Sequence, residues 1–404
     1  MPAIVALPQV VEELLLQFGD IFPNEPARVH FAEYITGLLV AEQKTVSGIA
    51  REFADAPDQS CLNRFLTESP WEPDRLNDQR LDWLQHDPTT RYRQDGVIPI
   101  DNTLIDHDGK LIDDVGWFWD HADQRHLIAH DYLFINYVNP SGKHYPLDFR
   151  RFRKREQCDD AHPFQSHTDL TKHLIDWVVA EGIPGDFTFD SYFTNGPIMN
   201  HIQRHNRGYI GDLKFNRVIT VRGQDMTVSE WGATLGPLVR TKFTVGGHTQ
   251  WYFTKTIRIP KVNHPVRLLV LWSSADAKEP RKILVTNRIH WEAHHILKVY
   301  KRRWTGTEPY HRDGKQHLGM GACQLRDGVG QTRHMYLVMM VYTALMRQLK
   351  HDRALEWAHA RLMTIGESCR AIARETLTKT LAWAVEQAQQ GLSLPDIQHR
   401  LALD

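Results

Sequence analysis

The chain has few cysteines and no long apolar run, and both absences exclude classes of protein. Its cysteines are widely spaced and form no CxxC pair, which argues against a zinc ribbon or a disulfide framework and suits a reducing cytoplasm. No run of about 18 apolar residues occurs, so no membrane span is expected. The first residues lack a basic segment and include Glu12 and Glu13, so we expect no secretory signal.

The chain also has little net charge, −1 over 404 residues, but that charge is unevenly distributed. Residues 1–90 hold six Lys or Arg and fifteen Asp or Glu, a balance of −9, whereas residues 91–404 hold 42 and 34, a balance of +8. The total alone does not indicate a nucleic-acid-binding protein. The excess of positive charge in residues 91–404 is nevertheless compatible with binding to nucleic acid.

Residues 1–90 are predicted to be helical, because their apolar residues recur with a spacing near 3.6. Within them, residues 44–69 could form two short helices joined by a turn. A helix-turn-helix whose second helix begins near Asp58 fits this pattern. A plain helical hairpin fits equally well, and the acidic balance of the region favours it at least as strongly.

The middle of the chain alternates strands and helices. Residues 96–101, 130–139 and 144–152 are predicted strands, followed by a helix over 168–183, a strand over 185–190, a helix over 197–206 and a strand over 209–216. Residues 216–288 are rich in strand-like segments separated by turn residues. Helical patterns return from about residue 289 to the end. The order predicts an α/β protein.

Two segments concentrate positive charge. Residues 281–315 hold nine Lys or Arg and only three acids, Glu292, Glu308 and Asp313, and a shorter basic run spans Arg150–Arg155. A single run of this kind is usually a solvated face. Two runs that flank candidate acids favour contacts with phosphates.

Three acids stand out by position. Asp101 and Asp190 each end a predicted strand, and Glu308 lies on a predicted helix beyond the β-rich block. Brought together, three carboxylates would repel one another, and a divalent metal would relieve that repulsion. The alternative is that all three are ordinary turn acids or members of structural ion pairs.

The chain resembles the DDE transposases of bacterial insertion sequences over most of its length. The resemblance rests on IDNTLIDHDGK around Asp101, on DFTFDSYFTNGPIMNHI around Asp190 with the following GDLKFNR, and on a Tyr-Arg-Glu-Lys signature. The signature residues are Tyr300, Arg303, Glu308 and Lys315. KQHLGMGACQLRDG, YITGLL and RFLTES are also similar to segments of that family.

The resemblance implies a fold and a division of the chain. The expected fold is α/β, an RNase H-like mixed sheet flanked by helices and interrupted by a β-rich insertion, with helical N- and C-terminal regions. The expected parts are a helical region that could bind DNA ends (1–90), the catalytic core (91–215 and 289–345), the β-rich insertion (216–288) and C-terminal helices (346–404).

It also implies a chemistry. Asp101, Asp190 and Glu308 would hold Mg²⁺, with Mn²⁺ as a substitute and two ions expected, for in-line attack on DNA phosphodiesters. The substrates would be double-stranded terminal inverted repeats and target DNA, held by a homodimer in a bacterial, nucleoid-associated, cytoplasmic setting. Candidate DNA contacts are Tyr300, Arg303, Lys315, Lys214 and Arg217, with Arg302 as an alternative to Arg303.

A tryptophan of the β-rich insertion could stack on a flipped end base, as in hairpin-forming relatives. Trp231, Trp251 and Trp272 are available, although core packing is the preferred interpretation of each. His121, His126 and His130 invite a zinc hypothesis, but their spacing matches no helical zinc motif. Solvated or core-edge histidines are therefore the preferred interpretation.

The signature departs from the family in one respect. Four residues separate Arg303 from Glu308, where three are usual, and we expect Gly306 to absorb the extra residue in a bulge or kink. The departure keeps two alternatives open. One is a catalytically impaired DNA-binding regulator derived from a transposase, and the other is an RNase H-like nuclease without strand transfer.

Overall fold

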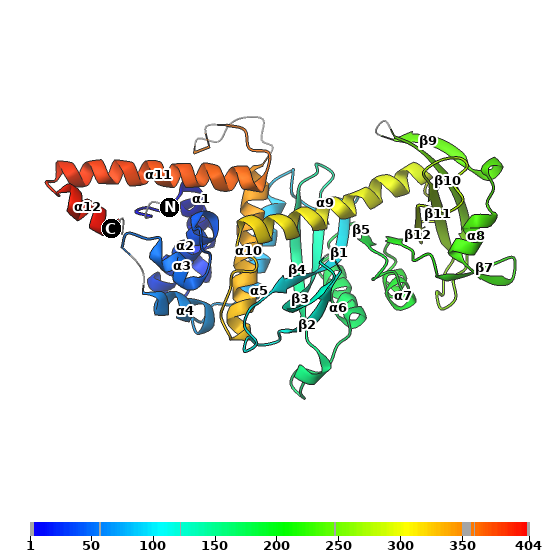
Figure 1. Ribbon diagram of the computed structural model, residues 1–404, viewed down its shortest axis with the longest axis horizontal. Helices are drawn as coiled ribbons and strands as arrows, with labels where there is room; N and C mark the ends of the chain where they lie inside the picture. The colour runs from blue at the N-terminus through cyan, green and yellow to red at the C-terminus, as the bar shows by residue number, and fades with distance from the viewer. Residues whose placement is uncertain are drawn as a thin grey trace.

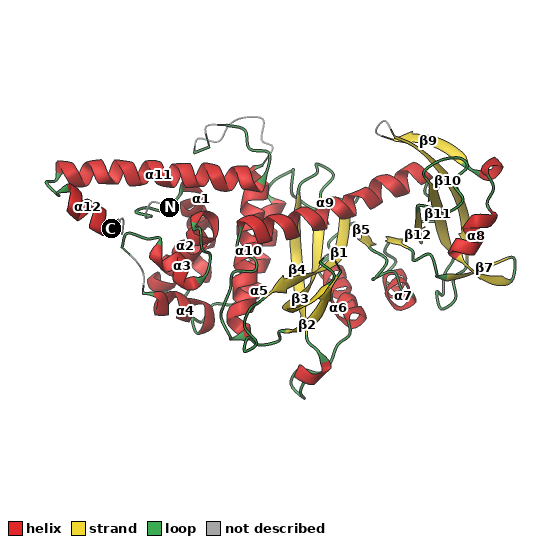
Figure 2. Cartoon of the chain, in the orientation of Figure 1, coloured by secondary structure: helices red, strands yellow, loops and turns green. Residues whose placement is uncertain are grey.

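The computed structural model describes residues 4–55, 58–121, 123–245, 248–349, 357–358 and 360–401. One large mixed sheet lies at the centre, with a helical region at one end and a β-rich block at the other (Figure 1, Figure 2). This confirms the predicted mixed α/β architecture, in which helices flank the sheet and helical regions occupy both ends of the chain.

Residues 91–215 supply the first strands of the sheet. They are β1 (Val97–Asp106), β2 (Gly116–Asp120), β3 (Arg125–Val138), β4 (His144–Phe152), β5 (Asp186–Phe189) and β6 (Tyr209–Asp212). Strands β1, β5 and β6 are parallel neighbours, and β3 is antiparallel to β1, β2 and β4. Strand β2 was not predicted, because its short sequence GWFWD shows no clear alternation. It pairs with an early part of β3 that the sequence left outside any strand.

The β-rich block extends the same sheet. Strand β12 (Lys282–Thr286) pairs antiparallel with β6, and β11 (Val266–Trp272), β10 (His248–Ile257) and β9 (Thr241–Val245) follow in that order. A separate hairpin, β7 (Val218–Val221) with β8 (Gln224–Thr227), and helix α8 (Val228–Thr234) complete the block. The strand-like segments predicted in residues 216–288 do form strands, but four of the strands continue the central sheet.

Helices cover the two faces of the sheet. Helices α6 (His167–Ala180) and α7 (Gly196–Arg204) share a core with Ile98 and Ile100 of β1. Helix α9 (Ala293–His317) lies on the opposite face and crosses it from the β-rich block to the N-terminal helices (Figure 1). Because side chains alternate along a strand, Asp101 belongs to the α9 face, the opposite face to Ile100.

The two ends of the chain pack together. The N-terminal helices are α1 (Gln9–Phe18), α2 (Glu25–Val40), α3 (Val46–Arg51), α4 (Gln59–Thr67) and α5 (Pro73–Gln85), with Asp58 capping α4. They share one apolar core with α10 (Gly328–Gln348) and the first turns of α11 (Ile365–Gln389). Helix α12 (Leu394–Arg400) closes the chain. No helix among the described residues is long and apolar enough to cross a membrane.

Candidate active site

Three acids follow the paired ends of three neighbouring parallel strands. Ile100 of β1 pairs with Phe189 of β5, and Phe189 pairs with Gly211 of β6. The residue that follows each of these three positions is acidic, which places three side chains in one row across the sheet: Asp101, Asp190 and Asp212. The carboxyl ends of parallel strands are where open α/β sheets place their sites.

The prediction that Asp101 ends a strand is wrong. Strand β1 continues to Asp106, paired with β3, and it is only the pairing with β5 that stops at Ile100. The residues after Asp101 keep their antiparallel neighbour, so they remain extended. Asp190 directly follows its strand, since β5 stops at Phe189, one residue before the predicted end.

Asp101 is held by helix α9. The Arg303 guanidinium lies 3.1 Å from its Oδ2, and both side chains are largely buried. The pKa of Asp101 is raised to about 6, chiefly by burial; Arg303 and the Thr307 hydroxyl oppose this rise, and the Asp190 carboxylate contributes to it. Asp101 and Asp190 are therefore close enough to repel one another, which is the condition that a divalent cation would relieve.

Asp190 is fixed by the turn that follows β5. Its Oδ1 accepts the backbone N–H groups of Tyr192 at 2.9 Å and Phe193 at 3.3 Å. Its backbone carbonyl accepts the Thr194 hydroxyl at 2.6 Å. An Asp at this position is typical of a tight turn, because its side chain bonds the backbone two residues on. One carboxylate oxygen is used this way, and the other has no hydrogen bond among the described residues.

Asp212 is the member of the row that the sequence did not single out. Its Oδ2 lies 3.1 Å from Lys282 Nζ on β12, and the same ammonium lies over the Tyr300 ring, 5.0 Å from its centroid. Burial raises the pKa of Asp212 in spite of Lys282 and Arg303, and Asp190 raises it further. Asp212 lies in the segment GDLKFNR, but only the register between β5 and β6 shows that it belongs to the same row as Asp190.

Helix α9, which carries Glu308, lies alongside β1. Its Gly306 packs on Pro99, its Arg303 reaches Asp101, and the Lys315 ammonium donates to the Leu104 carbonyl at 2.8 Å. Glu308 lies between these contacts and its side chain is exposed. Among the described residues its carboxylate does not join Asp101 and Asp190 within 4.8 Å. Ligands that surround two metal ions about 4 Å apart need not approach one another so closely.

The expected bulge at Gly306 is not present, because helix α9 is uninterrupted from Ala293 to His317, with Pro309 inside it. Gly306 serves a close approach instead, because a Cβ there would lie 2.5 Å from Val138 Cγ2 and 2.7 Å from Pro99 Cγ.

The extra residue therefore acts through helical rotation. At about 100° per residue, the usual spacing would leave the arginine and the glutamate roughly 40° apart, whereas Arg303 and Glu308 are about 140° apart. Arg303 turns onto Asp101, and Trp304 takes the position one turn before Glu308.

The remaining candidate DNA contacts fall into two groups. Tyr300 and Arg303 are buried, with Tyr300 between Lys282 and Arg303. The others lie nearer the surface. Lys214 and Lys315 are exposed, Arg302 donates to the Asp95 carbonyl at 2.7 Å, and Arg217 donates to the Thr194 carbonyl at 2.7 Å, close to Asp190.

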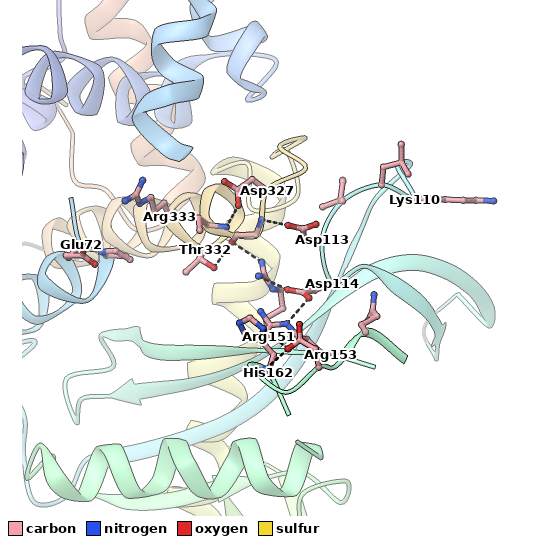
Figure 3. Close-up of a pocket in the computed structure, with 17 residues that line it drawn as sticks. Glu72, Lys110, Asp113, Asp114, Arg151, Arg153, His162, Asp327, Thr332 and Arg333 are labelled. Carbon is pink, nitrogen blue, oxygen red and sulfur yellow. Dashed lines mark hydrogen bonds and ion pairs between the residues drawn. The ribbon is translucent and has the colours of Figure 1, made fainter. Parts of the chain in front are cut away.

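The basic run Arg150–Arg155 is largely neutralised within the protein. Asp114 receives Arg151 and Arg153, each at 2.7 Å, and Arg150 lies 2.5 Å from Asp148. Arg151 and Arg153 line a cleft of about 830 Å³ together with Asp113, Asp114 and Asp327 (Figure 3). With acids on its walls, this cleft offers little attraction to a phosphate backbone, so the predicted phosphate contacts of this run find no support.

The tryptophans proposed for base stacking lie mostly in the core. Trp231 and Trp272 are buried, which confirms core packing for these two, and Trp251 is half-buried. Trp304 on α9 was overlooked and is 60% exposed, beside Arg303 and one turn from Glu308. His130 is also a core residue, hydrogen-bonded to His107 at 2.9 Å, while His121 and His126 are exposed.

A family model described as DDE superfamily endonuclease matches residues 17–238 of the chain. The matched span includes Asp101, Asp190 and Asp212 and ends before Glu308. No curated protein matches the chain.

Proposed function

The chain belongs to the DDE superfamily endonucleases, and from this premise we propose that it is a transposase that cuts and joins DNA at the ends of an insertion sequence. Membership implies a nuclease-type enzyme that acts on DNA and a family that uses divalent metal. The observation that carries the finer proposal is the alignment of Asp101 and Asp190 after the last paired residues of two adjacent parallel strands, beneath helix α9, which carries the exposed Glu308.

The donor set fits a hard divalent cation. Asp101, Asp190 and Glu308 offer only carboxylate oxygens, which suit Mg²⁺ and Mn²⁺ better than metals that prefer nitrogen or sulfur. The Arg303 guanidinium already compensates the negative charge of Asp101, which indicates that positive charge is stabilised at this point of the site. Bound ions would activate the attacking hydroxyl and stabilise the leaving oxygen.

The residues of this chain would position the DNA. Lys298, Lys301 and Lys315 are exposed on α9 and would contact phosphates near the site. Trp304 offers an exposed ring for an unpaired end base. Arg303 would hold Asp101 ionised until the substrate and its cations arrive. The N-terminal region 1–90 would engage the element's end, and a homodimer would bridge two ends.

The test is nicking of supercoiled plasmid by the purified full-length protein with Mn²⁺. We expect Asp101→Asn and Asp190→Asn each to reduce the rate by at least about 1000-fold, as loss of a group that stabilises the transition state does. Asp106→Asn is the matched control, because this acid lies on the same strand but is exposed and pairs with Arg125. Equal activity in all four proteins would overturn the proposal.

Two other functions remain distinguishable. A DNA-binding regulator without catalysis is favoured by the Arg303–Asp101 ion pair, which occupies a carboxylate that catalysis needs. It predicts DNA binding without nicking at any metal concentration. A nuclease without strand transfer would nick plasmid but would not join pre-cut element ends to a target DNA.

A further inference from the structure

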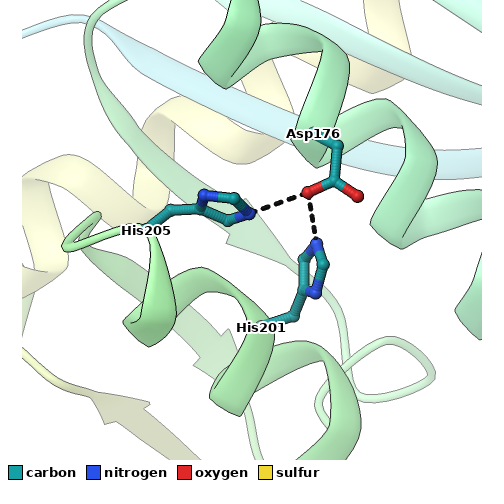
Figure 4. Close-up of side chains that lie close together, drawn as sticks. All are labelled: Asp176, His201 and His205. Atoms are coloured by element: carbon teal, nitrogen blue, oxygen red, sulfur yellow. Dashed lines mark hydrogen bonds and ion pairs between the residues drawn. The ribbon is translucent and has the colours of Figure 1, made fainter.

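A cluster of metal-ligating side chains lies away from the row of acids. Asp176 of α6 accepts two histidines on the same oxygen: His201 Nε2 and His205 Nε2 each lie 2.7 Å from its Oδ1 (Figure 4). The ligand atoms of the three residues all lie within 4.8 Å of one another. Among the described residues, no other group of three His, Cys, Asp or Glu converges in this way.

We propose that Asp176, His201 and His205 form a binding site for one divalent transition metal of the Zn²⁺ class. Two imidazoles and one carboxylate are the ligand types that Zn²⁺ accepts, and solvent would complete a tetrahedron. His201 and His205 are four residues apart at the end of α7, so they share one face of the helix. The sequence HIQRH carried this spacing, although the triad needed Asp176 from another helix.

The site is independent of the proposed nuclease centre. Helices α6 and α7 pack on the Ile98 and Ile100 face of the sheet, whereas Asp101 belongs to the α9 face. The two helices precede and follow β5, so a metal between them would join the two segments that position Asp190. We therefore expect binding to stabilise the fold around Asp190 without supplying a reacting group.

Arg204 gives the proposal its sharpest control. Its guanidinium donates to His201 Nδ1 at 2.8 Å, which keeps the ring proton on Nε2, the atom that a metal would take. Metal binding moves that proton to Nδ1, so Arg204 must swing away, and its positive charge also opposes the cation. In Arg204→Gln a side-chain carbonyl can accept from Nδ1–H, and such support typically changes metal affinity by about 10–100-fold.

The experiment titrates the chelator-treated full-length protein with Zn²⁺ by calorimetry and with Co²⁺ by visible absorbance. We expect one equivalent with the intense spectrum of tetrahedral Co²⁺, retained in an Asp101→Asn/Asp190→Asn double variant. Asp176→Asn, His201→Gln and His205→Gln should each weaken binding by at least about 100-fold, more than loss of a supporting group does. Arg204→Gln should strengthen it, a gain that misfolding cannot produce.

His162→Gln is the matched control. His162 also pairs with a single carboxylate, Asp159, at 3.2 Å, but no second histidine of the described part of the chain joins them. This variant should bind as the parent does. The proposal is overturned if no saturable equivalent is found, if His205→Gln binds normally, or if the equivalent disappears in the Asp101→Asn/Asp190→Asn variant.

Discussion

The two basic segments of this chain look alike in sequence and differ in the folded protein. In Arg150–Arg155, three arginines face Asp114 and Asp148, and the remaining cations lie against aromatic rings: Lys154 over Phe118 and Arg155 over Phe164. Helix α9 uses one arginine on Asp101 and leaves Lys298 and Lys301 exposed. A count of cations therefore says little about a surface until the acids that approach it in space are known.

Breaking the first segment should cost stability. Arg151→Gln removes one of the two cations on Asp114, and both partners of that ion pair are buried, so we expect a loss of about 2–3 kcal/mol in the free energy of unfolding. Chemical denaturation measures it. Arg125→Gln is the control, because its ion pairs with Asp106 and Asp123 are exposed and worth under about 1 kcal/mol.

The same pairing has a signature in pH. Burial acts against ionisation of Asp114, but the Arg153 hydrogen bond and the Arg151 charge together hold its pKa below the usual value. A lowered carboxyl pKa adds stability above the ordinary pKa, and that stability is lost as the pH falls toward the lowered one. Arg151→Gln should therefore lose less stability on acidification than the parent. An equal acid sensitivity would contradict the paired description of this segment.

A substitution in the second basic segment, residues 281–315, should weaken DNA binding. Trp304→Ala should weaken binding of DNA with an unpaired end by about 1–2 kcal/mol, roughly tenfold, with little change for fully paired duplex. Fluorescence anisotropy with the two DNA forms measures the difference. Trp117→Ala is the control, since Trp117 is also exposed but lies on β2 near the first basic segment. Equal losses in both variants would remove Trp304 from the site.

Arg303 connects the second segment to the proposed metal site. The pKa of Asp101 is raised to about 6, chiefly by burial, although the Arg303 guanidinium acts to lower it, so Arg303→Gln should raise it further. A proton then competes with metal up to a higher pH, so the rise of metal-dependent nicking should move to higher pH. Arg302→Gln, which removes only a bond to the Asp95 carbonyl, should leave the profile in place. A shift in the opposite direction would contradict the assignment.

The smallest effects belong to single lysines. Lys298→Gln or Lys301→Gln should each lower the slope of log affinity against log salt by about 1, with a few-fold loss of affinity at low salt. Lys154→Gln, in the first segment, should leave that slope unchanged. Slopes that fall equally in both segments would erase the distinction between them.

The sequence predicted where helices and strands lie along the chain better than it predicted which residues they bring together in the fold. Alternation and turn residues located β5, β6 and the strands after residue 216, and the strand end placed Asp190. Asp212 was missed because the register of three parallel strands is a property of the folded sheet. The neutralisation of Arg151 was missed because Asp114 lies 37 residues earlier in the chain.

The rotation of Arg303 onto Asp101 was the subtler miss. The extra residue was noticed in the sequence, but a helix can absorb an insertion either as a bulge or as a turn of about 100°. The choice depends on what lies beneath it. Pro99 and Val138 leave room for no side chain at position 306, so glycine was needed for contact, and the helix continues through it without a bulge.

The most direct test of the central claim is a crystal structure of the full chain with Mn²⁺ and an anomalous difference map. The account predicts metal bound between Asp101 and Asp190, with Glu308 as a ligand and Arg303 displaced from Asp101. Mn²⁺ absent from this row, with Arg303 still on Asp101 and Glu308 still facing solvent, would contradict it and favour a DNA-binding protein without catalysis.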